Sequence, residues 1–306
     1  MRSFPVLLNA MVVCFCCVFI KDAKAALVSV GGEYPIVGDT PGHQQHPSVA
    51  IHRNGGVVVW QNATSDSGGE RIVVQLLSSG FTGVSMPKVV SQNLSGQNEL
   101  NPDVALLADG SAVIVWEAGP RSARGIYIRF IDSEGRFTSK IMPVNTYDAG
   151  VQADAAVGAL PGGDILVVWS SDGQDGDGEG IYGQRFDPAG NKIGEEFRVN
   201  QSTGRNQSRP AITAMGDNQY VVAWVGESVN GRNSSGAPNL RRNAMARIIG
   251  VNGPSGNEYQ LNEGAVVATE ISVTGLVGGG YVAAWTQKDE VSTRNISEIY
   301  MRKFAS

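Results

Sequence analysis

Val57-Val58-Val59-Trp60 is the first of five apolar runs that end in tryptophan. The other four are Val113–Trp116, Leu166–Trp169, Val221–Trp224 and Val282–Trp285. These runs contain all five tryptophans of the chain, at intervals of 56, 53, 55 and 61 residues. A near-regular period of this length is typical of a repeat architecture. The sequence therefore predicts five tandem units with the same local structure.

The third unit shows most clearly what each repeat contains. Its short β-type runs are Asp154–Leu160, Asp164–Trp169, Ile181–Phe186 and Phe197–Asn200, separated by turn-forming segments. β-branched and aromatic residues fill these runs, and no apolar pattern of helical period extends over a useful length. Four strands in a unit of about 50 residues are typical of a propeller blade.

The two ends of the repeat array predict a closed ring. Units 41–92, 93–146, 147–201 and 202–263 are followed by a shorter unit, 264–306, which ends at its third strand, Ile299–Phe304. A spare segment near the start, Gly32–Val37, is similar to the fourth-strand segments Glu196–Val199 and Glu258–Leu261. We expect an all-β, five-bladed β-propeller of four-stranded antiparallel blades, one domain over residues 26–306, with residues 26–40 completing the last blade. An open solenoid is the competing architecture.

Three phrases of the third unit, Val167–Gly173, Gly180–Asp187 and Gly194–Asn200, carry a resemblance to a known family. They resemble the tandem repeats of large secreted and surface bacterial proteins, which often also carry haemolysin-type calcium-binding or cadherin-like modules. The resemblance covers essentially residues 26–306 and implies an exported bacterial β-propeller. It implies no shared catalytic chemistry, and this chain lacks the glycine-rich calcium repeats of those proteins.

Residues 1–25 have the features of a secretory signal peptide: Arg2, an apolar run over Val6–Ile20, and Ala23-Lys24-Ala25 as a cleavage site. All three cysteines lie in that apolar run, so the remaining chain forms no disulfide. A net charge of −5 without Lys/Arg clusters argues against nucleic acid as a partner. With no second long apolar stretch, we expect no membrane insertion after signal removal, and a secreted or periplasmic protein.

The five tryptophans have two interpretations. Each ends a strand of Val, Ile and Ala residues, which favours a structural blade core formed by Trp60, Trp116, Trp169, Trp224 and Trp285. Alternatively, five symmetry-related rings stack on sugars in a multivalent glycan site. We expect the core role.

An acidic loop in the third unit is the sharpest chemical feature. It places Asp172, Asp175, Asp177 and Glu179 on a glycine-rich backbone that could wrap a hard cation. No cofactor is firmly predicted, and Ca²⁺ at these four residues is the one ion to consider, as a weak stabilising ligand. The alternative is a solvated hairpin loop of turn-forming residues.

A proline near the start of several first strands aligns a second set of candidates. The next position holds Ser48, Asp103, Asp154, Ala211 and Glu270. If Asp103, Asp154 and Glu270 converge near the channel, they resemble in residue type the carboxylates of five-bladed glycoside hydrolases such as arabinanases. A polar channel lining without catalysis is the default interpretation.

Two further features complete the candidates. His43, His46 and His52 lie within ten residues and could bind a metal, but a chance cluster on a connecting loop is the favoured interpretation. The insertion Gly226–Asn243 carries Arg232, Arg241 and Arg242 and is either a recognition loop or a disordered flap, with neither favoured.

We therefore expect an exported, non-catalytic binding or scaffolding propeller that recognises a protein or glycan through loops on one face. The alternative is a glycoside hydrolase-like carbohydrate-active enzyme that uses the channel carboxylates Asp103, Asp154 and Glu270.

Overall fold

All regular secondary structure in the described part of the chain is β-strand, as the turn-punctuated apolar runs predict. The computed structural model describes residues 33, 35–36, 42–64, 69–91, 98–216, 218–232, 235–264, 266–289 and 296–305. Within these ranges there is no helix long and apolar enough to span a membrane. The chain divides into two units, Met1–Pro35 and Ile36–Ser306, and every strand belongs to the second. The predicted signal peptide, residues 1–25, lies outside the described residues.

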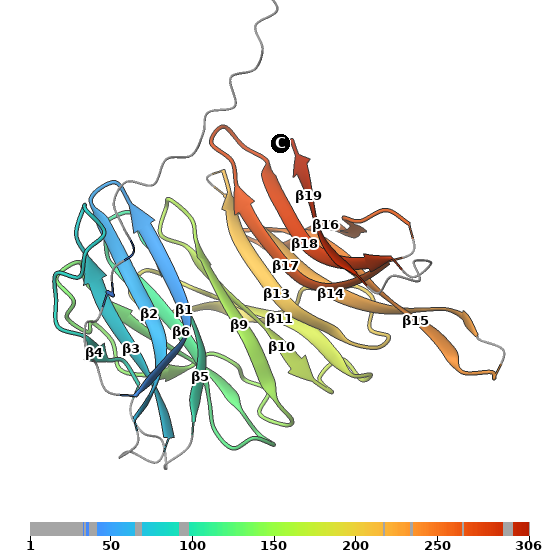
Figure 1. Cartoon of the computed structure of the whole chain (residues 1–306), viewed down its shortest axis with the longest axis horizontal. Helices are drawn as coiled ribbons and strands as arrows, with labels where there is room; N and C mark the ends of the chain where they lie inside the picture. The colour runs from blue at the N-terminus through green and yellow to red at the C-terminus, as the bar shows by residue number, and fades with distance from the viewer. Residues whose placement is uncertain are drawn as a thin grey trace, which may run out of the picture. The chain divides into compact units, whose positions relative to one another are not determined.

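The strands form successive antiparallel sheets in chain order (Figure 1). The first sheet contains β1 (His43–His52), β2 (Gly55–Thr64), β3 (Gly69–Leu77) and β4 (Lys88–Val89). The second contains β5 (Glu99–Leu106), β6 (Ala112–Ala118), β7 (Gly125–Ile131) and β8 (Met142–Pro143). The third contains β9 (Gln152–Ala159), β10 (Ile165–Asp172), β11 (Glu179–Phe186) and β12 (Lys192–Arg198).

The remaining strands repeat this order. β13 (Gln207–Met215), β14 (Gln219–Arg232), β15 (Pro238–Gly250) and β16 (Gly253–Gln260) form a fourth group, and β17 (Val266–Gly275), β18 (Tyr281–Asp289) and β19 (Ser297–Phe304) form a fifth. One bridge between Arg242 and Val267 joins these two groups into a seven-stranded sheet. We refer to them as the fourth and fifth sheets. The all-β, β-propeller type of architecture predicted from the repeats is therefore confirmed.

The tryptophans lie between the sheets. Trp116, Trp169 and Trp224 are completely buried, and Trp60 and Trp285 are 4% and 5% exposed. Each of the later four belongs to a cluster that includes apolar residues of the preceding sheet, as Trp169 does with Val113 and Val115. Trp60 instead belongs to a cluster drawn entirely from its own sheet. The core of this fold is thus a series of layers between neighbouring sheets.

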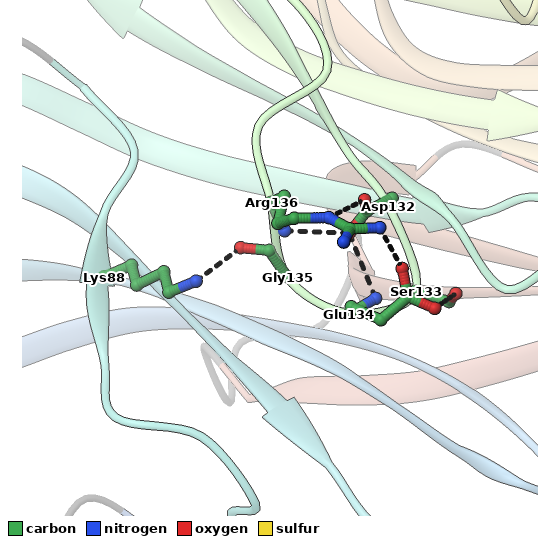
Figure 2. Close-up of polar contacts among 6 residues, drawn as sticks. All are labelled: Lys88, Asp132, Ser133, Glu134, Gly135 and Arg136. Carbon is green, nitrogen blue, oxygen red and sulfur yellow. Dashed lines mark hydrogen bonds and ion pairs between the residues drawn. The ribbon is translucent and has the colours of Figure 1, made fainter.

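Cationic side chains also connect each sheet to the one before it. The four bonds to a carbonyl near the end of the preceding sheet are Arg129 Nη1 to Val90 O (2.6 Å), Lys192 Nζ to Val144 O (2.6 Å), Arg247 Nη1 to Val199 O (2.7 Å) and Arg302 Nη1 to Leu261 O (3.0 Å). Figure 2 shows a further link between the first two sheets, in which Lys88 Nζ donates to the Gly135 carbonyl at 2.6 Å. That carbonyl belongs to a turn in which Arg136 pairs with Asp132 and Glu134.

Ring closure by residues 26–40 is not established. β19 is the last strand of its sheet, and of the predicted closing segment only Glu33, Pro35 and Ile36 are described, none of them in a strand. The Ile36 carbonyl oxygen lies close to Gly83, which forms a bridge with Leu77 of the first sheet. It is 3.2 Å from the position that a Cβ atom on Gly83 would occupy. Closure therefore stays a prediction.

Candidate functional site

The first strand of every sheet is irregular near its beginning, and this irregularity positions the candidate site. The register shifts between Gln45 and Ser48 in β1, and at matching places in β5, β9, β13 and β17. In four of these strands a non-glycine residue has left-handed backbone: His46 (φ 49°), Asn101 (φ 48°), Asp154 (φ 53°) and Arg209 (φ 57°). Such residues are strained by about 1–3 kcal/mol and cluster at functional sites.

Strand pairing corrects the alignment on which the catalytic candidates were chosen. Ser48 pairs with Val59 and Asp103 with Val115, each one residue before a tryptophan. The residues that pair in the same way in the third and fifth sheets are Ala156 and Ser272. Asp154 and Glu270 lie two residues earlier, at the position that is left-handed in β1, β5, β9 and β13; Glu270 itself is not left-handed and pairs with Thr286. The proline-based alignment is therefore wrong by two residues in these two sheets.

The three candidate carboxylates do not share one pocket. Asp103 lines a cavity of about 380 Å³ that we call the central cavity, to which all five first strands contribute residues. There it accepts bonds from Ser48 Oγ (2.7 Å) and from the backbone N–H of Val157 (2.9 Å). Burial raises the pKa of Asp103, and these two bonds oppose that effect. Glu270 is exposed and lines neither this cavity nor the pocket that contains Asp154.

Asp154 instead lines a second cavity of about 390 Å³, which we call the polar pocket. Its charged and amide lining comes from the third and fourth sheets and consists of Asp154, Glu179, Asn206, Arg209, Glu227 and Arg242. Arg242 Nε pairs with Glu227 Oε1 at 2.8 Å, and Asn206 Nδ2 donates to Glu227 Oε2 at 3.1 Å. A concave site with several convergent polar groups is the best-supported candidate site in the described structure.

Burial raises the pKa of both Asp154 and Glu179, but their neighbours act in opposite directions. The Asp154 carboxylate faces Arg209 and Arg124, whose positive charges lower its pKa again, as do bonds from the Arg209 backbone and Ser170. Glu179 instead has three nearby carboxylates, Asp154, Asp172 and Glu227, each of which raises its pKa further, and only a hydrogen bond with Ser208 acts against them. Both pKa values are raised overall, but the neighbouring charges favour the protonated form of Glu179 and the ionised form of Asp154, which is the division of roles that acid–base chemistry requires.

The predicted calcium loop is engaged in hydrogen bonds within the protein. Asp175 accepts from Asn200 Nδ2 at 3.3 Å, and Asp177 accepts from the backbone N–H of Arg205 at 3.2 Å. Glu179 lines the polar pocket, and Asp172 is exposed at the end of β10. Among the residues described, no group of three or more His, Cys, Asp or Glu side chains could hold a metal ion, and this includes the histidine cluster. Calcium binding stays a prediction.

Sequence reasoning missed most of the polar pocket. Arg209, Glu227 and Arg242 were not among its candidate catalytic residues, and Glu179 was considered only as a metal ligand. One signal was present: Arg209 precedes Pro210 as Asn101 precedes Pro102, and the residue before a proline near a strand's start marks the bulge column. The insertion Gly226–Asn243 forms the extended ends of β14 and β15, and its base contributes Glu227 and Arg242.

Comparison with known proteins identifies relatives of the fold. No protein-family model matches the chain, and no curated protein sequence matches it. Among solved structures, it is similar to an α-L-arabinanase from Penicillium chrysogenum complexed with arabinobiose, with a TM-score of 0.53, 11% identity, and coverage of 82% of this chain and 79% of that one. It is also similar to an α-L-arabinofuranosidase from Fusarium graminearum in complex with an iminosugar inhibitor, with a TM-score of 0.54, 11% identity, and coverage of 84% and 80%.

At this identity the similarity establishes the fold and no residue roles. It nevertheless overturns the main functional expectation. The prediction of a non-catalytic binding or scaffolding propeller is wrong on this finding, because both neighbours are named as glycan-cleaving enzymes. The comparison supports a β-propeller family in general, whereas the narrower resemblance to haemolysin- and cadherin-associated bacterial repeats is not supported by it.

Proposed function

We propose that this protein is a glycoside hydrolase-like enzyme that cleaves arabinose-containing glycans in the polar pocket. The observation that carries the proposal is that two partly buried carboxyl groups, Glu179 and Asp154, line the same polar cavity. Neighbouring cations lower the pKa of Asp154, whereas neighbouring carboxylates raise that of Glu179. Hydrolysis of a glycosidic bond needs one protonated and one ionised carboxyl group on either side of the bond. The arabinan substrate class comes from the similar solved structures.

In this proposal Glu179 is the general acid that protonates the departing sugar oxygen. Asp154 is the ionised partner, acting as nucleophile or as the base that activates water. Arg209 and Arg242 lie in the same pocket, where their guanidinium groups can donate hydrogen bonds to sugar hydroxyls. Asp103 has no role in this proposal, because it lines the other cavity and its carboxylate oxygens already accept bonds from Ser48 and Val157.

Two substrates separate the two roles. We expect Glu179→Gln to lower turnover of arabinan by about 10²–10⁴-fold, the usual contribution of a general acid. The same variant should retain much more activity on 4-nitrophenyl α-L-arabinofuranoside, because nitrophenolate departs without being protonated. Asp154→Asn should lose activity on both substrates. Reducing-sugar release and nitrophenolate absorbance measure the two reactions.

Glu195→Gln is the matched control, since Glu195 is an exposed carboxylate in β12 outside the pocket, and its activity should equal that of the unaltered protein. Binding of arabinan without any turnover by the unaltered protein would contradict the proposal. Equal losses on both substrates in Glu179→Gln would remove Glu179 from the role of acid.

We also propose that the ring is five-bladed and that Gly32–Val37 supplies the missing fourth strand beside β19. First strands of all five sheets line the central cavity. Gln75 pairs with Val58 as Arg247 pairs with Val222, so it holds the position from which an arginine reaches the preceding sheet elsewhere. Both the Gln75 amide and the Ile36 carbonyl lie next to Gly83. The nearness of Ile36 to Gln75 supports a place for this segment, relative to the first sheet, like that of Val199 relative to the fourth.

Removing residues 1–40 is expected to cause aggregation or a large fall in melting temperature, because it exposes the Trp60 side of the first sheet and leaves β19 unpaired. Removing residues 1–25 alone is the control and should have no such effect. Static light scattering and thermal unfolding measure the outcome. A shortened protein that stays monomeric and equally stable would contradict ring closure by this segment.

We include three further expectations in this proposal. They are a secreted or periplasmic location after loss of residues 1–25, the bacterial repeat resemblance, and weak Ca²⁺ binding at Asp172–Glu179. Calcium is tested by a melting shift with the ion. A shift that survives Asp175→Asn combined with Asp177→Asn would assign the ion to another place.

A further inference from the structure

A hydrogen bond of one kind recurs between consecutive sheets. The side chain of the residue after each of the first three tryptophans accepts from the backbone N–H of the left-handed residue in the next sheet. Gln61 Oε1 accepts from Asn101 N at 3.2 Å, Glu117 Oε1 from Asp154 N at 2.8 Å, and Ser170 Oγ from Arg209 N at 3.1 Å. The series ends at Val225, whose side chain has no acceptor. These bonds satisfy an N–H that the strand irregularity removes from the ladder.

Glu117 differs from the other two in placing a carboxyl group, which can ionise, in a completely buried position. It also accepts from Asn101 Nδ2 at 2.9 Å and from Arg124 Nη1 at 2.8 Å. Burial raises the pKa of Glu117, but all three partners are donors, and their bonds favour the ionised carboxylate. A glutamine or serine performs the same structural task in the neighbouring sheets, so a buried carboxylate is not required for it.

The carboxylate of Glu117 also affects Asp154 on the next sheet, through Arg124. Arg124 is near enough to Asp154 for its positive charge to lower the pKa of that carboxyl group. Because Glu117 pairs with Arg124, it reduces this effect and at the same time holds the backbone of Asp154. A charge-assisted bond to the N–H is also stronger than the neutral equivalents made by Gln61 and Ser170.

We propose that Glu117 is a positioning residue for Asp154: it fixes the left-handed backbone that directs the Asp154 side chain to the polar pocket, and it neutralises Arg124 beside that side chain. This inference rests on the proposed catalytic role of Asp154. It adds a residue of the second sheet, outside the lining of the pocket, to the determinants of the reaction.

The test compares three variants of the whole chain. Glu117→Ala should lower kcat on arabinan by about 10–100-fold with KM changed less than about threefold, since small misplacements of a reacting group have effects of this size. Glu117→Gln keeps an acceptor for Asp154 N and should restore most of kcat. Gln61→Ala removes the equivalent bond one sheet earlier, to Asn101, and should leave kcat unchanged.

A second measurement does not depend on activity. The carboxyl group of Asp154 is titrated by ¹³C NMR and assigned with Asp154→Asn. Both Glu117 variants should lower the pKa of Asp154, because Arg124 is then unneutralised, whereas Gln61→Ala should not move it. If the unaltered protein has no activity but the titration behaves as described, the proposed function fails and the electrostatic effect of Glu117 on Asp154, through Arg124, stands. If Glu117→Ala and Gln61→Ala act alike in both measurements, the positioning role is overturned.

Discussion

Replacing Trp169 with alanine is expected to lower the free energy of unfolding by about 3–5 kcal/mol, as truncation of a large buried aromatic side chain usually does. Trp169 is completely buried and packs with Val113, Val115 and Ile128 of the second sheet. Because the sheets are held together by such layers, the cavity left by alanine would lie in the middle of the fold, where neighbouring strands cannot collapse into it. Reversible urea unfolding followed by far-UV circular dichroism gives the value.

A matched pair of phenylalanine variants separates packing from hydrogen bonding. In the described structure Trp169 Nε1 has no hydrogen-bond partner, whereas Trp224 Nε1 donates to Gln207 Oε1 at 3.1 Å. Trp224→Phe should therefore cost about 1–3 kcal/mol more than Trp169→Phe, because it leaves a buried acceptor unpaired. A loss below about 1 kcal/mol in Trp169→Ala would contradict the role of this ring as a packing element between sheets.

The repeat could be predicted from the sequence because the second strand of each sheet is buried on both faces and therefore consists almost entirely of apolar residues. The second strands, such as β6 and β10, are buried along nearly their whole length, so they appear as uninterrupted apolar runs before each tryptophan. The turns and the four-strand order follow from the same pattern. Closure of the ring was harder to predict, because it depends on one short segment near the start of the chain. Three residues of that segment are described.

The site was harder to predict because of a register error that hydrophobicity does not detect. Side chains alternate with a period of two along a strand, so a slip of two residues keeps every apolar residue on its own face. The proline used to align the first strands is present as Pro47, Pro102 and Pro210. It is absent from β9 and β17, and these are the two strands that were misaligned. In the structure Asp154 is one of the left-handed residues and lines the same pocket as Glu179. The 25-residue separation of these two carboxylates in the sequence did not indicate that they share a pocket.

Above about pH 10, the protein is expected to lose stability steeply with increasing pH, by about 1.4 kcal/mol per pH unit for each of two buried phenols. Tyr220 is completely buried, and its hydroxyl donates to the Asp164 carbonyl at 2.6 Å; burial and the nearby Asp164 carboxylate raise its pKa. Tyr281 is 2% exposed and bonds the Tyr259 hydroxyl at 2.7 Å, and burial raises its pKa as well.

The sign follows from the direction of these shifts. Both folded-state pKa values lie above the unfolded value of about 10, so the stability that they contribute is complete below that pH and is lost as the unfolded chain releases protons that the folded chain retains. Tyr220→Phe should reduce the slope of unfolding free energy against pH by about half of the two-phenol contribution. Tyr300→Phe is the control, because Tyr300 is 41% exposed and its change removes neither buried phenol, so the slope should fall less than in Tyr220→Phe. Phenolate absorbance that develops fully before any unfolding would show that Tyr220 and Tyr281 ionise in place, and would contradict their role in alkaline unfolding.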